Sequence, residues 1–97
     1  MKGVYCIKNK INSKLYIGSS NNIDVRISTH FRNLKENKHH NQVLQNSYNK
    51  YGKHNFTYEI LEIVNDEINK EELLLIEQKH IDKYDFEMLF NINRITN

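Results

Sequence analysis

The stretches that decide the fold are Gly3-Val4-Tyr5-Cys6-Ile7 and Leu15-Tyr16-Ile17-Gly18, two short runs of β-branched and aromatic residues near the start of the chain. Such residues favour extended backbone, and the polar segment 8–14 between them, with its asparagines and its serine, is typical of a turn. The pattern predicts a β-hairpin that places one tyrosine on each of two neighbouring strands.

Two helices are predicted to follow the hairpin. Residues 19–22 offer N-cap side chains for a helix over 23–35, and a polar stretch, 36–41, leads to a second helix that ends near Tyr51, with Gly52 as its stop. Inward-facing positions recur at about 3.6 residues in both helices. They are Ile23, Ile27, Phe31 and Leu34 in the first helix, and Leu44, Tyr48 and Tyr51 in the second.

The second half of the sequence adds a strand, a helix and an extended segment. Residues 56–64 predict a strand, and a third helix with its cap in residues 65–69 is expected to end near Tyr84 or Asp85, before an extended segment over 88–92. Short strands interleaved with helices favour an α+β fold, a small three-stranded antiparallel sheet flanked by helices. We expect residues 1–97 to form a single domain, because so short a chain has room for one modest core.

Charge is distributed unevenly along the chain. Residues 1–58 carry ten Lys/Arg against two acids, whereas residues 59–97 carry four against ten, within a net charge of +2. A basic face built from the first half would attract polyanions by counterion release. A fold that interleaves the two halves would cancel this effect, and the sequence leaves both arrangements open.

Composition limits the class of protein. Cys6 is the only cysteine, which excludes an internal disulfide framework and suits a reducing compartment. The longest apolar runs, such as residues 73–76, are four residues long, and no signal-peptide profile is present. We therefore expect a soluble, cytoplasmic protein without a membrane segment, and no feature indicates an obligatory protein partner.

Glu77 is the side chain that packing does not explain. In the third predicted helix, Leu74, Glu77, Ile81 and Tyr84 share one stripe, so a carboxylate takes a core-facing position. Acids are rarely buried unless they are paired or bound to a metal. The sequence leaves two interpretations open, a salt bridge to Arg26 and a metal site.

The tripeptides Gly3-Val4-Tyr5 and Tyr16-Ile17-Gly18 resemble the motif of the GIY-YIG nuclease family, with only Val4 in place of isoleucine. The resemblance covers nearly the whole chain, and its spacing and Asn/Lys-rich composition are most similar to the phage and intron-encoded homing endonuclease branch. It implies a metal-dependent endonuclease, a phosphodiester hydrolase that cleaves double-stranded DNA with Mg²⁺, for which Mn²⁺ can substitute. Its implied site residues are Tyr5, Tyr16, Arg26, His30, His39, Glu77 and Asn91.

The resemblance implies a role for each of these residues. Glu77 would be the single protein ligand of Mg²⁺, Tyr5 would take a proton from the attacking water, and Tyr16 would hydrogen-bond the scissile phosphate or that water. A free phenol has a pKa of about 10, so the role of Tyr5 requires cationic neighbours that favour the phenolate. Arg26 and His30, four residues apart on one helix flank, are the candidates.

The remaining implied roles leave alternatives open. Arg26 would clamp the phosphate, and His30 would relay a proton to or from Tyr5 or fix its orientation. His39, rather than His40, matches the family's additional histidine, but a surface loop that contacts the DNA backbone or nothing is equally compatible. Asn91 would orient the site or contact phosphate, or it closes the last strand as a turn residue. The five histidines show no spacing typical of structural zinc.

Basic side chains around this site are expected to contact the DNA backbone, which positions DNA without reading its sequence. They are Arg26, Arg32, Lys35, Lys38, His40, Lys50 and Lys53. Tyr48, Tyr51, Tyr58 and Tyr84 are assigned to packing. Members of the mobile-element branch usually carry a separate C-terminal DNA-binding region, so we expect a domain of a longer protein or a stand-alone form with low sequence specificity. The alternatives are a non-catalytic DNA-binding module on the same scaffold and an RNA-directed or repair nuclease.

Overall fold

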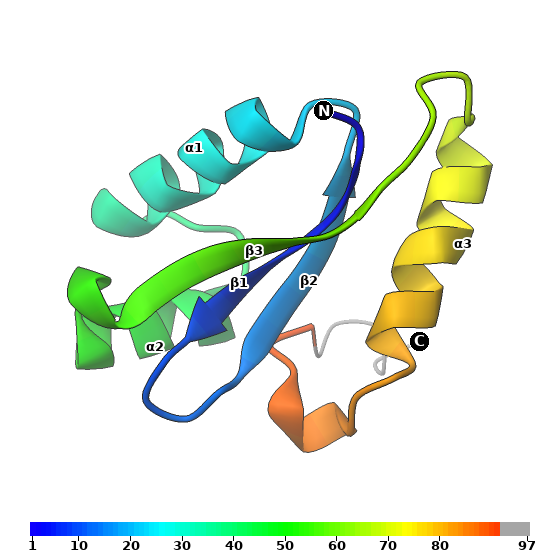
Figure 1. Ribbon diagram of the computed structural model, residues 1–97. Coiled ribbons are helices and arrows are strands. Elements are labelled where there is room, and N and C mark those ends of the chain that lie inside the picture. The colour runs from blue at the N-terminus through cyan, green and yellow to red at the C-terminus, as the bar shows by residue number, and fades with distance from the viewer. Residues whose placement is uncertain (92–97) are drawn as a thin grey trace.

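The centre of the fold is strand β1 (Gly3–Asn9), which pairs on both sides. Its neighbours are β2 (Leu15–Ser20) and β3 (Phe56–Ile63), both antiparallel, in the order β2-β1-β3. The computed structural model describes residues 1–91 and confirms the predicted three-stranded antiparallel sheet (Figure 1). Six of the seven residues of β1 are buried, because layers of helix cover both faces of this strand.

Local geometry explains both the hairpin turn and the glycine at position 3. The turn is closed by two backbone hydrogen bonds: the N–H of Asn9 donates to the carbonyl oxygen of Lys14, and the N–H of Ser13, which has φ 64°, donates to the carbonyl oxygen of Asn9. On the other side of β1, a register shift between Val4 and Tyr5 brings the backbone of β3 close, and a Cβ at Gly3 would overlap the carbonyl group of Glu62. The first glycine of the tripeptide pair is thus a position that needs close backbone approach.

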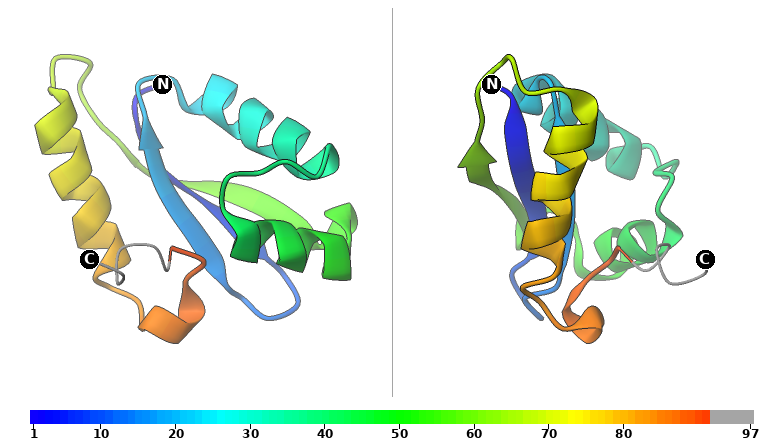
Figure 2. Two further views of the ribbon diagram at one scale, coloured as in Figure 1. Left: turned by 180° about the vertical axis from the view of Figure 1, so that it is seen from behind. Right: turned by 90° about the vertical axis from the view of Figure 1, so that its right-hand side faces the viewer.

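Helices cover the two faces of the sheet unequally. Helices α1 (Ile23–Lys35) and α2 (Gln42–Tyr51) lie on one face and α3 (Lys70–Ile81) on the other (Figures 1 and 2). Each face has its own apolar cluster. The first consists of Tyr5, Ile7, Ile23, Ile27, Leu34, Leu44, Phe56 and Phe90, and the second of Val4, Cys6, Leu15, Ile17, Leu73, Ile81 and Leu89.

Caps define where the helices begin and end. Asn22, Asn41 and Asn69 each accept a hydrogen bond from the first turn of the helix that follows, and Asn69 forms a reciprocal capping box with Glu72. Gly52 ends α2 at φ 86°, as predicted. Two short 3₁₀ turns that the sequence did not indicate, η1 (Lys53–Asn55) and η2 (Phe86–Met88), join these elements.

The end of the third helix was predicted too late. It stops at Ile81, and Tyr84 lies within the connection to η2. Beyond η2, the expected extended segment contributes one parallel bridge, from Leu89 to Leu15, while residue 92 lies outside the described residues. Within the described residues, none of the helices is both long and apolar enough to cross a membrane.

Two helices depart from the predicted inward-facing positions at single residues, whereas Ile23, Ile27 and Leu34 in α1 and Ile81 in α3 are buried as predicted. In α3 the buried leucine is Leu73, whereas Leu74 is 46% exposed. In α1, His30 is buried and Phe31 is only half-buried. The run of apolar residues 73–76 covers every side of a helix, so periodicity could not tell which residue faces the sheet.

The assignment of four tyrosines to packing was half wrong. Tyr48 and Tyr51 pack against the first apolar cluster. Tyr58 and Tyr84 are 46% and 37% exposed, because Tyr58 lies on edge strand β3, where helix coverage ends, and Tyr84 lies past the end of α3.

Candidate active site

Gly18 makes room for the phenol of Tyr5. Tyr5 on β1 pairs with Gly18 on β2, and a Cβ at position 18 would lie 2.5 Å from the Tyr5 oxygen. The phenol therefore lies across the edge strand, and only a residue without a side chain fits beneath it. Tyr5 itself is 1% exposed, so its hydroxyl lies beneath an edge strand of the sheet.

The Tyr5 hydroxyl begins a chain of buried ring contacts. Its oxygen lies 2.7 Å from Nε2 of His30, and Nδ1 of His30 lies 2.7 Å from Nε2 of His39. The backbone N–H of Asn41 donates to Nδ1 of His39 at 3.0 Å. His30 and His39 are only 3% and 5% exposed, so both rings belong to the interior.

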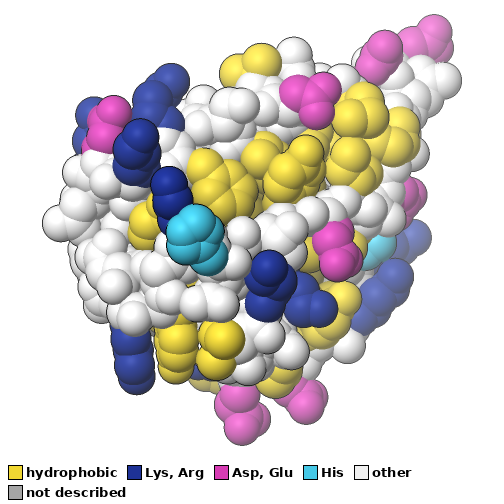
Figure 3. Space-filling model, turned by 60° about the vertical axis from the view of Figure 1, so that its left-hand side comes forward, with side chains coloured by type: hydrophobic (Ala, Val, Ile, Leu, Met, Phe, Trp, Pro, Cys, Tyr) yellow, Lys and Arg dark blue, Asp and Glu magenta, His cyan; other side chains and the backbone are white. Residues whose placement is uncertain are grey.

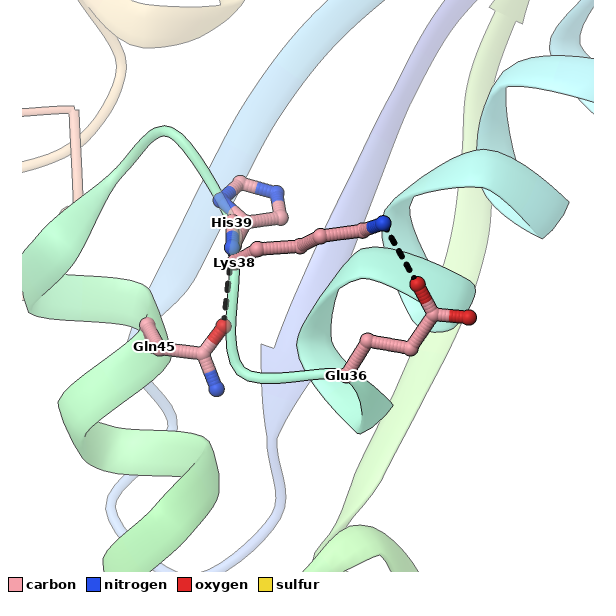
Figure 4. A network of polar contacts seen from close by, with 4 residues as sticks. All are labelled: Glu36, Lys38, His39 and Gln45. Carbon is pink, nitrogen blue, oxygen red and sulfur yellow. Dashed lines mark hydrogen bonds and ion pairs between the residues drawn. The ribbon is translucent and has the colours of Figure 1, made fainter.

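The loop that carries His39 is fixed to both neighbouring helices. The backbone N–H of His39 donates to Oε1 of Gln45 on α2 at 3.0 Å (Figure 4). Nε2 of Gln45 donates in turn to the carbonyl oxygen of Leu34 at the end of α1. The same loop carries His40, which is exposed, and an exposed ion pair between Lys38 and Glu36.

Burial decides the protonation of the two inner histidines. It lowers the pKa of His30 from its ordinary 6.5 to about 3, and the charges of His39, His40 and Arg26 act in the same direction. Burial and His40 lower the pKa of His39 to about 4. Both rings are therefore neutral near pH 7. The expectation that His30 is a cation favouring the Tyr5 phenolate is wrong, because the ring is removed from water.

Tyr16 lies on the same face of β2 as Gly18, two residues earlier. Its ring joins the cluster formed by Tyr5, His30 and His39. Tyr16 pairs with Ile7 across the sheet, and its hydroxyl lies 3.2 Å from Nε2 of His40. Its ring also contacts the rings of His30 and His39 edge-on. Burial, followed by the charge of Glu77, raises the pKa of Tyr16, and Arg26 lowers it.

Across the edge of β2 lies a pocket of about 400 Å³ that α1 and α3 line together. Its lining consists of Ser19, Ser20, Asn21, Arg26, Lys70, Leu73, Leu74 and Glu77. Arg26 and Glu77 enter from helices on opposite faces of the sheet. Both influence Tyr5: burial, then Tyr16 and Glu77, raise the pKa of its phenol, whereas the charge and hydrogen bonding of Arg26 lower it.

Glu77 lies on the sheet-facing side of α3, four residues after buried Leu73 and four before buried Ile81, but at the margin of the core. It is half-buried, and its Oε1 accepts a hydrogen bond from the Ser19 hydroxyl at 2.6 Å. The salt bridge to Arg26, one of the two interpretations that the sequence left open, is not among the ion pairs within residues 1–91. Because Glu77 contacts Ser19 on the edge strand β2, its carboxylate lies at the pocket rather than within the apolar cluster.

The chemistry of this carboxylate suits a hard divalent cation. No group of three or more metal-ligating side chains occurs within the described range. A metal here would rest on Glu77, water and phosphate oxygens of a substrate. Mg²⁺ is commonly bound in this way, through one or two carboxylates and several waters.

Asn91 acts on strand β2 rather than on the pocket. Its Oδ1 accepts from the backbone N–H of Ile17, and its Nδ2 donates to the carbonyl oxygen of the same residue, both at 2.8 Å. The side chain thus continues the sheet at its free edge, between Tyr16 and Gly18. Of the roles considered for Asn91, orientation of the site agrees with these contacts.

The other predicted DNA contacts are dispersed. Arg32, Lys35 and Lys53 line a second groove of about 550 Å³, together with Phe31, Tyr48, His54 and Phe56. Figure 3 shows an apolar area on the molecule's surface with Lys, Arg and His side chains beside it. Arg26 and Lys35 are nine residues apart, hence on opposite sides of α1, so this groove lies away from the pocket. Lys50 lies over the ring of Tyr51 instead.

Sequence reasoning missed several residues of the site. Ser19 follows Gly18 directly and, by strand alternation, faces α3, so this alternation could have indicated it. Lys70 and Gln45 gave no such signal, because their places depend on how the helices pack.

Comparison with known proteins agrees with this geometry. The family model described as the GIY-YIG catalytic domain matches residues 1–91, nearly the whole chain. This chain belongs to the GIY-YIG family. It is a GIY-YIG nuclease domain related to homing endonucleases, as its two tyrosine-glycine tripeptides predicted.

Two curated relatives share this GIY-YIG region. Intron-associated endonuclease 1 of Enterobacteria phage T4 is 40% identical over 78 residues, 80% of this chain. Probable intron-encoded endonuclease 1 of Neurospora crassa is 32% identical over 96 residues, 96% of this chain. The chain spans 30% of the length of each relative.

Solved structures share the GIY-YIG fold. The catalytic domain of homing endonuclease I-TevI matches with a TM-score of 0.79 and 32% identity, over 86% of this chain and 87% of that one. A mutant of the same domain matches with a TM-score of 0.76 and 34% identity, over 86% and 84%. The α+β arrangement of three strands and three helices is therefore that of a GIY-YIG catalytic domain.

Proposed function

We propose that this chain hydrolyses phosphodiester bonds of duplex DNA, with water as the nucleophile and Mg²⁺ as the metal, as the nuclease domain of a homing-type endonuclease. The observation that carries the proposal is the meeting of a phenol, a guanidinium and a carboxylate at one edge of the sheet. Arg26 and Glu77 line one pocket from two helices, together with Ser19, the neighbour of the Gly18 against which the Tyr5 phenol lies, and both residues shift the pKa of that phenol. Packing alone gives no reason for this set.

Arg26 is suited to bind the scissile phosphate. Its guanidinium is exposed at the pocket, and none of the ion pairs within residues 1–91 engages it. A planar guanidinium matches two phosphate oxygens and stabilises charge that develops during an in-line displacement. Lys70, on the same pocket, adds a second positive charge near the phosphate.

Glu77 is suited to hold the metal, with Ser19 fixing one carboxylate oxygen. A bound Mg²⁺ would neutralise phosphate charge and make a coordinated water more acidic. Tyr5 would accept the proton of the attacking water as a phenolate, and Tyr16 would hydrogen-bond the phosphate or that water. Arg26 is the neighbour that favours ionisation of Tyr5 against the effect of burial.

The basic groove on the far side of α1 would hold DNA away from the cleaved bond. Its cationic rim carries Arg32, Lys35 and Lys53, and no acid is among its lining residues. Backbone contacts of this kind add affinity and salt dependence without sequence specificity. Replacing Lys35 and Lys53 with glutamine should lower the magnitude of the slope of log affinity against log salt by about 1–2, whereas Lys79→Gln on α3 with Lys83→Gln just beyond its end should leave the slope unchanged. Equal slopes in both double variants would remove this groove from the DNA surface.

Cleavage of supercoiled plasmid in Mg²⁺ tests the function directly. The wild-type chain should convert plasmid to nicked or linear DNA, and Glu77→Ala should not. The matched control is Glu71→Ala, an exposed glutamate on the first turn of the same helix, which should cut normally. Circular dichroism verifies that all three proteins fold.

Two outcomes would contradict the proposal. Equal cutting by folded Glu77→Ala would remove this carboxylate from the metal site. Failure of the wild type to cut in Mg²⁺ or Mn²⁺, with retained DNA binding at low salt, would favour the non-catalytic binding module.

A further inference from the structure

A buried chain of hydrogen bonds runs from the backbone N–H of Asn41 through His39 and His30 to Tyr5. Its donor-to-acceptor direction is fixed, because the Asn41 N–H can only donate. A backbone N–H is a donor and never an acceptor. The N–H of Asn41 points at Nδ1 of His39 at 3.0 Å, so this ring nitrogen carries no proton. A neutral imidazole has one proton, and that of His39 is consequently on Nε2.

The same reasoning applies to the ring of His30. Nε2–H of His39 faces Nδ1 of His30 at 2.7 Å, so Nδ1 of His30 accepts. The proton of His30 is then on Nε2, which faces the Tyr5 oxygen at 2.7 Å. Each ring nitrogen of the pair has one partner, and no buried polar side-chain atom within residues 1–91 lacks a hydrogen bond.

We propose that the backbone amide of Asn41, acting through His39, fixes the tautomer of His30 so that His30 donates a hydrogen bond to Tyr5. His39 and His30 are then positioning residues, and His30 is not the acceptor of the Tyr5 proton. The tautomer follows from these contacts alone, whereas its consequence for cleavage depends on the proposed nuclease function. The relay of a proton from Tyr5 to His30, one of the two roles expected from the sequence, is replaced by the orienting role.

The backbone N–H of Asn41, the first donor of this hydrogen-bond chain, is held in place by neighbouring contacts. Asn41 is the N-cap of α2: its Oδ1 accepts from the N–H of Leu44, and its Nδ2 donates to the carbonyl oxygen of Phe90. The same side chain is 3% exposed. The opposite direction would place a proton on Nδ1 of His39 against the Asn41 N–H, two buried donors facing each other with no acceptor between them.

The direction determines what Tyr5 can do. Its oxygen accepts from His30, so its own proton points away from the rings. As a phenolate, Tyr5 would be stabilised by the same Nε2–H donor, and it would accept the proton of the attacking water to become the hydroxyl again. Before the next turnover that proton leaves to water at the pocket, and both histidines remain neutral throughout.

The first test needs no cleavage. Long-range ¹H–¹⁵N correlation spectra of histidine-labelled wild-type protein near pH 7 report which ring nitrogen carries the proton. We expect the Nε2–H tautomer for both His30 and His39, and the exposed His54 serves as a reference signal. A proton on Nδ1 of His30, or a doubly protonated ring, would overturn the proposal whether or not the protein is a nuclease.

The second test replaces His39, the residue that donates a hydrogen bond to Nδ1 of His30. The amide of His39→Gln can still donate to Nδ1 of His30, whereas His39→Leu cannot. We expect His39→Gln to keep the Nε2–H tautomer of His30 and most of kcat. His39→Leu should lose the single tautomer and lower kcat by about 10–100-fold with KM unchanged. If both variants keep the wild-type tautomer and rate, His39 has no positioning role, and the NMR signals of His30 show this even where a variant is less stable.

Discussion

At the scale of single residues, the packing around Gly3, Gly18 and Tyr5 explains why each of the two tripeptides contains a glycine. Gly3 admits the backbone of β3, and Gly18 admits the phenol of Tyr5. The motif thus provides room for neighbouring groups, through its glycines, as well as reactive side chains. Its tyrosine is useful only because the facing strand has no side chain where the phenol lies.

The space beneath Tyr5 can be tested with Gly18→Ala. The added Cβ would lie 2.5 Å from the phenol oxygen, which is hydrogen-bonded to His30, so the ring must move. We expect a loss of about 1–3 kcal/mol in the free energy of unfolding, measured by urea denaturation, because overpacking forces shifts in a dense core. In a Tyr5→Ala background the same change should cost much less. Equal costs in the two backgrounds would show that the phenol does not define this space.

The Tyr5 hydroxyl can be separated from its ring with Tyr5→Phe. We expect plasmid cleavage to fall by about 10²–10⁴-fold, the usual contribution of a general base. Stability should also fall by about 1–3 kcal/mol, because the buried Nε2–H of His30 loses its acceptor. Tyr51→Phe, a packing tyrosine on α2 that lines neither pocket, is the matched control and should cut at a normal rate. Comparable rates for the two variants would make Tyr5 a packing residue as well.

At the scale of elements, what the sequence could predict depended on how local the signal was. The hairpin, the caps and the stop at Gly52 were predictable, because each depends on a few neighbouring residues. Which leucine of α3 faces the sheet was not, since apolar residues 73–76 surround the helix, and so the exposure of Leu74 was missed. The contact of His30 with His39 depends on the loop between α1 and α2, whose Asn37 has φ 60°. An asparagine directly after a helix tolerates a positive φ, but this signal alone does not predict that the loop brings His39 back to His30.

The attachment of the C-terminal segment to β2 is an element-scale prediction. Asn91 makes two hydrogen bonds to Ile17, between the site tyrosine and glycine of β2. We expect Asn91→Ala to reduce the free energy of unfolding by about 1–3 kcal/mol and to reduce cleavage, because the edge strand loses its partner. Asn46→Ala, at an exposed position on α2, is the control. Unchanged hydrogen-exchange protection at Ile17 in Asn91→Ala would show that the side chain does not hold this strand.

At the scale of the whole molecule, the site exists because β2 is an edge. Helices α1 and α3 cover opposite faces of the sheet, and each extends past this strand, one with Arg26 and the other with Glu77. A central strand would keep these two side chains apart. The same layering buries His30 and His39 on the α1 side, so the protein removes two ionisable rings from water to build its site.

This burial predicts how the whole molecule responds to acid. The pKa values of His30 and His39 are lowered to about 3 and 4 in the folded state, against an ordinary value of 6.5. Between these values the unfolded chain binds more protons than the folded one, so stability is fully present above about pH 6.5 and is lost as the pH falls. With two groups, the free energy of unfolding should drop by about 2 kcal/mol per pH unit between pH 6 and 5.

Urea denaturation at several pH values measures this slope and can assign it. His39→Gln removes one of the two groups while keeping an amide donor for His30, so it should reduce the slope by about half. His54→Gln, at an exposed position, should leave the slope as it is in the wild type. A wild-type stability that stays flat from pH 6.5 to 5 would mean that the two inner rings can bind protons without unfolding. In that case the neutral, directed chain from Asn41 to Tyr5 could not be correct.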